Sequence, residues 1–183
     1  MPEHCLPDIF LNHILSMDYI SLYSSPLGSI TLASDGNSLT GLWFDGQKHF
    51  ASTLTDIDTR VNDSLPIFAE TTHWLDEYFS GRNPGYTPPL SLHVTPFRQR
   101  VYDILLTIPY GHTTTYGKIA RRIALEKGME HMSAQAVGSA IGRNPISIII
   151  PCHRVTGADG SLTGYAGGLE RKRRLLAIEH STI

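Results

Sequence analysis

The dipeptide Cys152-His153 has the clearest capacity for chemistry in this sequence of 183 residues. A thiolate is a strong nucleophile, but a thiol with a pKa of about 8.5 is only a few per cent ionised at neutral pH and needs a neighbouring base or positive charge. His153 and Arg154 supply one group of each kind. A buried structural cysteine beside an incidental histidine is the ordinary alternative, and the dipeptide alone leaves both interpretations open.

An apolar run leads directly to this cysteine. Residues 146–150 follow Asn144-Pro145 and predict a short buried strand that ends just before Cys152. Neighbouring residues of an extended strand point to opposite faces, so contact between Cys152 and His153 requires a turn here or an intervening water molecule. A rigid strand would place the thiol for chemistry at a fixed position.

A carboxylate that could orient the histidine stands further along the chain. The pattern from about residue 168 to 179 predicts a helix, on which Glu179 falls between Leu175 and Leu176 in the apolar sector. An inward Glu179 could hold a histidine as the third group of a triad-like relay. Lys172 falls in the same sector, which weakens this inference, and a solvated terminal glutamate remains the alternative.

Three further helices are predicted before this segment, over about 96–108, 116–127 and 134–142, each preceded by a residue that can cap its first turn. The second and third make a helix-turn-helix candidate, although such pairs also occur in proteins that do not bind DNA. Small residues on the third helix would let its backbone approach another helix or a minor groove about 6 Å wide. These residues are Ala134, Ala136, Gly138, Ser139, Ala140 and Gly142.

The first half of the chain has the pattern of a small sheet with one helix. Alternating apolar and polar residues between 20 and 44 predict an antiparallel meander. Apolar residues at helical spacing from Ile67 to Phe79 predict a helix that packs on it, and Gly81 stands where this helix would stop. Residues 81–95 contain three prolines and little periodicity, so they predict a linker.

Charge is distributed unevenly between the two halves. Residues 1–95 hold three basic and eleven acidic residues, giving 3 − 11 = −8, and residues 96–183 hold twelve basic and six acidic residues, giving 12 − 6 = +6. A basic half beside an acidic half is expected when one domain faces nucleic acid and the other repels it, although chance can also produce such a partition.

The cysteines and the apolar segments of the sequence indicate in which cellular compartment the protein is expected. Cys5 and Cys152 lie far apart and no secretory segment is evident, so we expect a free thiol at Cys152 in a reducing, cytoplasmic environment. The apolar run over residues 9–15 is interrupted by Asn12 and His13 and lacks preceding basic residues, so it predicts neither a signal peptide nor a membrane span.

One family shares the motifs described above. The sequence resembles the O6-alkylguanine-DNA alkyltransferases, also called methylated-DNA protein-cysteine methyltransferases, almost continuously over 96–180 and loosely over 20–95. The resemblance implies an α+β fold, with an N-terminal ribonuclease-H-like sheet domain over 1–90 and a C-terminal winged helix-turn-helix domain for DNA binding and catalysis over 91–183. It is carried by Asn144-Pro145, by Pro151-Cys152-His153-Arg154-Val155 and by Gly164-Tyr165-Ala166-Gly167-Gly168-Leu169.

The resemblance also implies an activity. Cys152 would irreversibly take an alkyl group from O6 of a guanine flipped out of double-stranded DNA, with no cofactor, and each molecule would act once. His153 would be the water-mediated base and Glu179 the acid that orients it. Asn144 would brace the adjacent turn, and Tyr116 would shape the path of the flipped base and donate toward its ring.

Further positions are expected to contact DNA or the extruded base. Gln135 stands where many relatives have an arginine that replaces the flipped nucleotide, so flipping would be supported less strongly here. His4, Cys5 and His13 do not match the spacing of a zinc site that some relatives carry, and no metal is expected. The expected contact residues are Ala134, Gln135, Ala136, Gly138, Ser139, Arg143, Arg154, Val155, Tyr165 and Ala166.

Two other classes of protein remain open at this point. A DNA-binding regulator without transfer activity, as in alkyltransferase-like relatives, would lack the acceptor cysteine, whereas a cysteine hydrolase would use Cys, His and Glu but turn over repeatedly. The sequence leaves open whether O4-alkylthymine is also a substrate, how large an alkyl group is accepted and what residues before 17 do. The family resemblance suggests a monomer.

Overall fold

The N-terminal part is a twisted sheet. The computed structural model describes residues 18–54 and 59–180. Strands β1 (Asp18–Ser25), β2 (Gly28–Ser34) and β3 (Leu39–Phe44) form the predicted antiparallel meander. Strand β4 (Thr59–Val61), which the sequence pattern did not predict, pairs in parallel with β1 and gives the order β3-β2-β1-β4.

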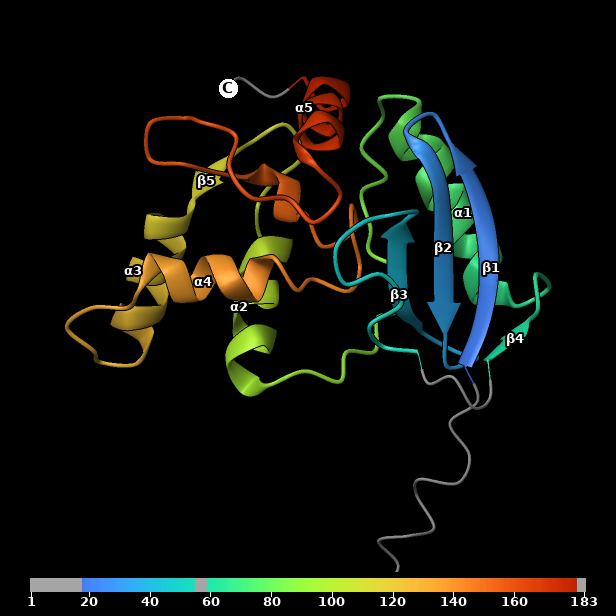
Figure 1. Cartoon of the computed structure of the whole chain (residues 1–183), viewed down its shortest axis with the longest axis horizontal. Coiled ribbons are helices and arrows are strands. Elements are labelled where there is room, and N and C mark those ends of the chain that lie inside the picture. Colours follow the sequence, from blue (N-terminus) through green and yellow to red (C-terminus); the bar gives the residue numbers. More distant parts are fainter. Residues whose placement is uncertain (1–17, 55–58, 181–183) are drawn as a thin grey trace, which may run out of the picture.

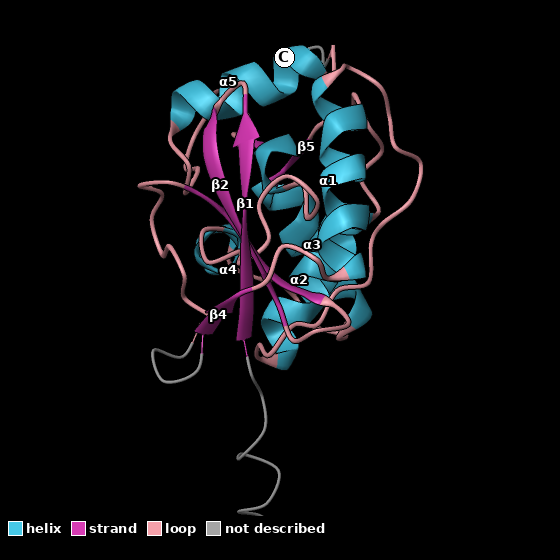
Figure 2. Ribbon diagram, turned by 90° about the vertical axis from the view of Figure 1, so that its right-hand side faces the viewer, coloured by secondary structure: helices cyan, strands magenta, loops and turns pink. Residues whose placement is uncertain are grey.

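One helix covers a face of this sheet. Helix α1 (Pro66–Phe79) occupies the predicted range and lies against the sheet in both Figure 1 and Figure 2. A proline in its first turn suits a helix start, where the missing N–H would have no intrahelical partner. Its buried face consists of Ile67, Phe68, Thr71, Trp74, Leu75 and Tyr78.

The second half of the chain is mainly helical. Each of the helices α2 (Pro96–Leu106), α3 (Tyr116–Glu126) and α4 (Ala134–Ile141) has a Thr or Ser side chain at its N-cap that accepts a backbone N–H bond, as predicted. Strands β5 (Thr114–Thr115) and β6 (Val155–Thr156) pair in parallel, and α5 (Leu169–Ile178) follows. None of the helices within the described ranges is long and apolar enough to cross a membrane.

The predicted strand over 146–150 was wrong, although its residues are buried. Ile146 makes a single isolated bridge to Leu42, and Ile148 has a φ of 70°, which is unusual for a β-branched residue. The physical reason is Asn144, whose Nδ2 donates to the carbonyl oxygens of both Ile146 (3.1 Å) and Ile150 (2.9 Å). These bonds satisfy the buried backbone within turns instead of a sheet ladder.

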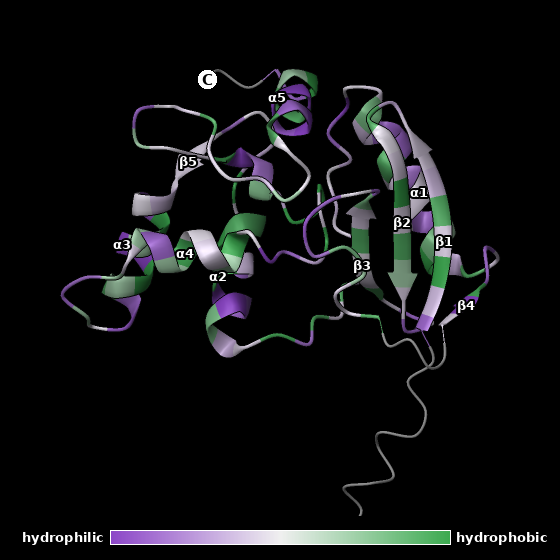
Figure 3. Ribbon diagram, in the orientation of Figure 1, coloured by the Kyte–Doolittle hydropathy of each residue, from purple (hydrophilic) through white to green (hydrophobic). Residues whose placement is uncertain are grey.

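Main-chain bonds along the outer edge of β3 join the two halves. Leu39 N donates to Pro89 O at 2.8 Å, Leu42 N donates to Pro145 O at 2.9 Å, and Ser147 N donates to Leu42 O at 2.9 Å. A continuous apolar cluster draws residues from both halves, and Figure 3 shows apolar positions along β2 and on α2 and α4. The segment that leads to Cys152 is therefore held directly against the sheet.

Candidate active site

Cys152 lies at the start of a turn of 3-10 helix, η2 (Cys152–Arg154). This turn supplies the change of direction that an extended strand would have lacked. The cysteine is only 3% exposed, and its Sγ accepts a bond from Asn144 Nδ2 at 3.2 Å. Asn144 Oδ1 in turn accepts from Ile146 N at 3.0 Å, so one amide fixes both the buried turn and the sulfur.

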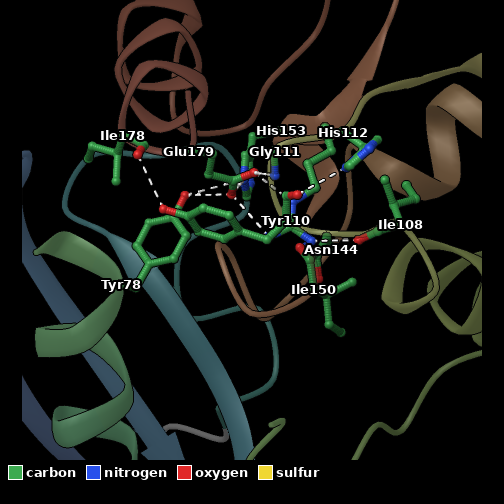
Figure 4. A network of polar contacts seen from close by, with 11 residues as sticks. Tyr78, Ile108, Tyr110, Gly111, His112, Asn144, Ile150, His153, Ile178 and Glu179 are labelled. Atoms are coloured by element: carbon green, nitrogen blue, oxygen red, sulfur yellow. Dashed lines mark hydrogen bonds and ion pairs between the residues drawn. The ribbon is translucent and has the colours of Figure 1, made fainter. Parts of the chain in front are cut away.

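His153 is paired with Glu179, which caps the C-terminus of α5 and faces inward, the first of the two alternatives that the helical pattern left open. Both side chains are buried, and His153 Nε2 lies 2.6 Å from Glu179 Oε1 (Figure 4). Because an ionised carboxylate only accepts hydrogen bonds, Nε2 carries the proton in this pair. The other ring nitrogen, Nδ1, has no hydrogen-bond partner among the described residues and is free to accept a proton.

Donors from three segments surround the Glu179 carboxylate. Tyr78 on α1 donates to Oε1 at 2.8 Å, and Arg154 Nε donates to Oε2 at 2.9 Å. Gly111 N donates to Oε2 at 3.2 Å, from a backbone with a φ of 76° where an added Cβ would lie 3.1 Å from Glu179 O. Burial alone would raise the pKa of Glu179, but the bonds from His153 and Arg154 lower it to about 2.

The pKa of His153 is also displaced. Burial lowers it, and the bond and charge of Glu179 oppose this effect without reversing it. His153 is therefore neutral at physiological pH, which is the state that a base requires.

Burial raises the pKa of the Cys152 thiol, and several groups act in the opposite direction, of which two are neighbouring side chains. One is the hydrogen bond from Asn144, and the other is the positive charge of Lys172. Lys172 is fully buried on α5 and donates from Nζ to Val155 O at 2.6 Å and to Thr163 O at 2.7 Å. Burial lowers its pKa to about 8, so it remains largely protonated at neutral pH. The sequence pattern placed Lys172 correctly in the apolar sector but gave it no role.

A groove of about 670 Å³ opens beside this cluster, and we call it the candidate groove. Helix α4 forms one wall, and the segment 163–166 forms another. The Tyr116 ring lies against α4, where an added Cβ at Gly138 would be 3.6 Å away, and its hydroxyl donates to Thr163 O at 2.9 Å. The expected contact residues in the lining are Tyr116, Ala134, Gln135, Gly138, Ser139, Arg143, Tyr165 and Ala166.

The sulfur lies behind this lining. Cys152 does not border the candidate groove, but Tyr116 and Tyr165 do. Burial raises the pKa of both tyrosines, and the nearby Cys152 adds to that rise. The thiol is therefore close to the groove and nearly closed off from it.

Two family models match this chain and together cover most of it. Residues 19–92 match the family model described as the ribonuclease-like domain of 6-O-methylguanine DNA methyltransferase, and residues 96–181 match the one described as its DNA binding domain. The chain belongs to the 6-O-methylguanine DNA methyltransferase family. The family and the α+β fold expected from the sequence are confirmed.

Individual members of the family cover most of the chain. The methylated-DNA--protein-cysteine methyltransferase of Mycobacterium tuberculosis is 44% identical over 157 residues, which are 86% of this chain and 89% of the relative. That of Methanosarcina acetivorans is 40% identical over 164 residues, 89% of this chain and 99% of the relative. A crystal structure of Mycobacterium tuberculosis OGT in complex with DNA has a TM-score of 0.78 at 41% identity and covers 88% of this chain and 92% of its own.

Three expected contact residues of this family member lie elsewhere. Arg154 is buried, with its guanidinium bonded to Glu179 and, at 2.6 Å, to Ile108 O. Val155 is fully buried, and Ala136 is half-buried outside the lining of the candidate groove. The charge of Arg154 therefore acts on the carboxylate within the site.

The described residues contain no group of three or more His, Cys, Asp or Glu side chains that could hold a metal ion. His4, Cys5 and His13, whose spacing we compared with a zinc site, lie outside the described residues.

Proposed function

We propose that this chain repairs double-stranded DNA by transferring an alkyl group from O6 of guanine to Sγ of Cys152. The observation that carries the proposal is a buried cysteine beside a His153–Glu179 pair, next to a groove whose wall is a helix of small residues. The named relatives act on methylated DNA and a protein cysteine, and a related OGT has been crystallised with DNA, which supports the same class of substrate here.

The groups around the sulfur divide the reaction between them. His153 Nδ1 takes the thiol proton through an intervening water, and the Nε2–H bond to Glu179 stabilises the imidazolium that forms. Lys172 and Asn144 stabilise the thiolate. A bond forms between sulfur and the alkyl carbon as the carbon–oxygen bond breaks. The guanine leaves with that electron pair and takes up a proton, for which we expect Tyr116 to be the donor.

The product explains why the protein acts once. A thioether between Cys152 and the alkyl group has no acyl centre for water to attack, so no step returns the thiol. One protein molecule is therefore consumed for each lesion repaired, and no cofactor takes part in the transfer.

Both the DNA and the protein must move before the alkyl group can reach the sulfur. The oxygen of a stacked guanine is out of reach, so the nucleotide must rotate by about 180° at a cost of a few kcal/mol. Because Cys152 is 3% exposed and does not border the candidate groove, we expect the segment 163–166, which does border it, to shift when the base enters. Gln135 borders the groove and is the side chain we expect to face the space left in the duplex.

The decisive experiment is the mass of the Cys152 peptide after incubation with a duplex that contains O6-methylguanine. We expect one added methyl group per molecule, in a single stoichiometric burst, and none in Cys152→Ala. An unmodified peptide, or product in excess of protein, would overturn the proposal, and excess product would favour a hydrolase. An O4-methylthymine duplex in parallel tests the second substrate.

The proposal extends to the organisation of the molecule. We propose two domains, 1–90 and 91–183, in a monomer that works in the cytoplasm. Limited proteolysis is expected to cut first within 81–95, where only an isolated bridge at Leu90 interrupts the irregular backbone. The mass in solution, measured with and without duplex, tests the oligomeric state.

A further inference from the structure

A smaller cavity of about 160 Å³, which we call the side cavity, adjoins the candidate groove. His49 and Arg143 line both, so the two spaces meet at these side chains. The whole lining of the side cavity is His49, Ser52, Thr53, His93, Val94, Arg98, Arg143 and Pro145.

The chemistry of this lining suits an anion. It contains two guanidinium groups, two imidazoles and two hydroxyls, and no carboxylate. In the described part of the chain no carboxylate lies within ion-pair distance of Arg98 or Arg143, whereas Arg100 and Arg122 both pair with Glu126. The charges of Arg98 and Arg143 are therefore not neutralised by protein groups.

The charges of both guanidinium groups also reach one neighbouring side chain. Burial raises the pKa of Tyr102, and the charges of Arg98 and Arg143 both oppose that rise, so both lie near this one side chain. Arginine pairs with a phosphate through parallel N–H bonds in a fixed planar geometry. Two such groups in the lining of one small cavity can hold one phosphate.

Hydrogen bonds hold the loop that bears His49. His49 lies in the loop after β3, where Lys48 N donates to Ala166 O at 3.0 Å and Thr53 Oγ1 donates to Thr40 O at 3.2 Å. Figure 1 shows this loop between β3 and α4. His93 lies in the segment just before α2. The side cavity is therefore formed jointly by the sheet domain, the linker and the helical part.

We infer that the side cavity is a phosphate subsite for the DNA strand that passes out of the candidate groove. The inference rests on the proposed function and adds a contact from the N-terminal half. That half has an excess of acidic residues, from which we expected only repulsion of a polyanion. His49 and His93 nevertheless place two imidazoles from this half in the lining of the side cavity. Each neutralised phosphate releases bound counterions, so the contact has a measurable salt dependence.

The test measures the affinity for a labelled O6-methylguanine duplex over a range of salt concentrations. We expect Arg98→Gln to weaken binding severalfold at low salt and to reduce the slope of log affinity against log salt by about one. Arg98→Lys, which keeps the charge, should retain the slope. The control Arg174→Gln removes an exposed charge outside both cavities and should behave as wild type.

The outcomes separate this inference from the proposed function. If wild type is methylated at Cys152 but Arg98→Gln and His93→Gln both keep the full slope and affinity, the subsite is refuted and the repair function stands. If wild type is not methylated, the proposed function fails. Inorganic phosphate at constant ionic strength should not compete with the duplex. Competition that Arg98→Gln abolishes would assign the side cavity to free phosphate instead.

Discussion

Among single residues, Lys172 has the largest unforeseen part in the site. It is a fully buried cation that donates hydrogen bonds to the carbonyl oxygens of Val155 and Thr163. A buried ammonium needs such acceptors to remain charged. After the hydrogen bond from Asn144, its charge is the next largest contribution that lowers the pKa of the Cys152 thiol against the effect of burial.

Removal of this charge should slow alkyl transfer. We expect Lys172→Met to raise the pKa of the Cys152 thiol and to reduce the transfer rate at pH 7 about tenfold for each unit of that rise. The difference in transfer rate between Lys172→Met and wild type should narrow as pH increases. The variant thiol then ionises, and wild-type Lys172, with a pKa of about 8, itself loses its proton. Rates with methylated duplex from pH 6.5 to 9.5 test this.

The control is Lys127→Met, which removes an exposed lysine on the surface. It should follow the wild-type rate throughout. A constant ratio between Lys172→Met and wild type across the whole pH range would show that the loss is one of packing instead of charge.

Residues were predictable from the sequence where a local pattern fixed their direction. The helical pattern over 168–179 put Glu179 between two leucines and so made an inward carboxylate one of two alternatives, and this side chain is 2% exposed. The same pattern put Lys172 inside but could not show which acceptors would hold it. Those acceptors belong to residues 155 and 163, which reach α5 only through the tertiary fold.

At the scale of elements, α1 reaches from the sheet domain into the candidate active site. Tyr78 lies near its C-terminus, 0% exposed, with its hydroxyl 2.8 Å from Glu179 Oε1 and 3.3 Å from His153 Nε2. Its ring stacks on Trp74 with centroids 5.4 Å apart. The sheet domain thus helps to position the buried His153–Glu179 pair next to Cys152.

Loss of this hydroxyl should lower the rate and leave DNA affinity unchanged. In Tyr78→Phe the ring packing is kept, but a hydrogen bond to a buried carboxylate is lost, which we expect to slow transfer about fivefold to tenfold. Tyr23→Phe is the matched control, because Tyr23 also donates to a carboxylate, Asp76, at 2.8 Å, but at the surface. Equal transfer rates in the two variants would contradict this role.

The predicted strand over 146–150 was wrong and strand β4 was missed because both depend on hydrogen bonds that the apolar pattern does not show. Residues 146–150 have the composition of a strand, yet Asn144 bonds their carbonyls into turns. Strand β4 lies in a polar stretch without alternation and forms only because β1 offers a free edge. The caps at Thr95, Thr115 and Ser133 were predictable because the whole motif lies within a few residues.

For the whole molecule, the network around Glu179 makes stability dependent on pH. The pKa of Glu179 is about 2 in the folded chain against an ordinary 4.5, so its ionised form favours folding above pH 4.5. This contribution, about 3 kcal/mol, declines as pH falls from 4.5 to 2. The pKa of His153 is also lowered in the folded chain, so His153 adds a further loss of stability that begins as pH falls below 6.5, its ordinary pKa.

We therefore expect the free energy of unfolding to fall steadily on acidification from pH 7 to pH 3. Denaturant titrations at several pH values measure it. Glu179→Gln should be less stable at pH 7 and show a flatter decline than wild type. The comparison between the two is essential because Glu126, with a pKa of about 2, titrates in the same window in both proteins. Parallel declines would show that Glu179 is not the source.

Glu179 has one further consequence, which concerns the order of synthesis. Its partners Tyr78, Gly111, His153 and Arg154 all precede it in the sequence. During translation Cys152 and His153 are therefore synthesised before Glu179, and the hydrogen bond between His153 and Glu179 cannot form until residue 179 has left the ribosome. The network around this carboxylate is thus one of the last parts of the described chain to be completed.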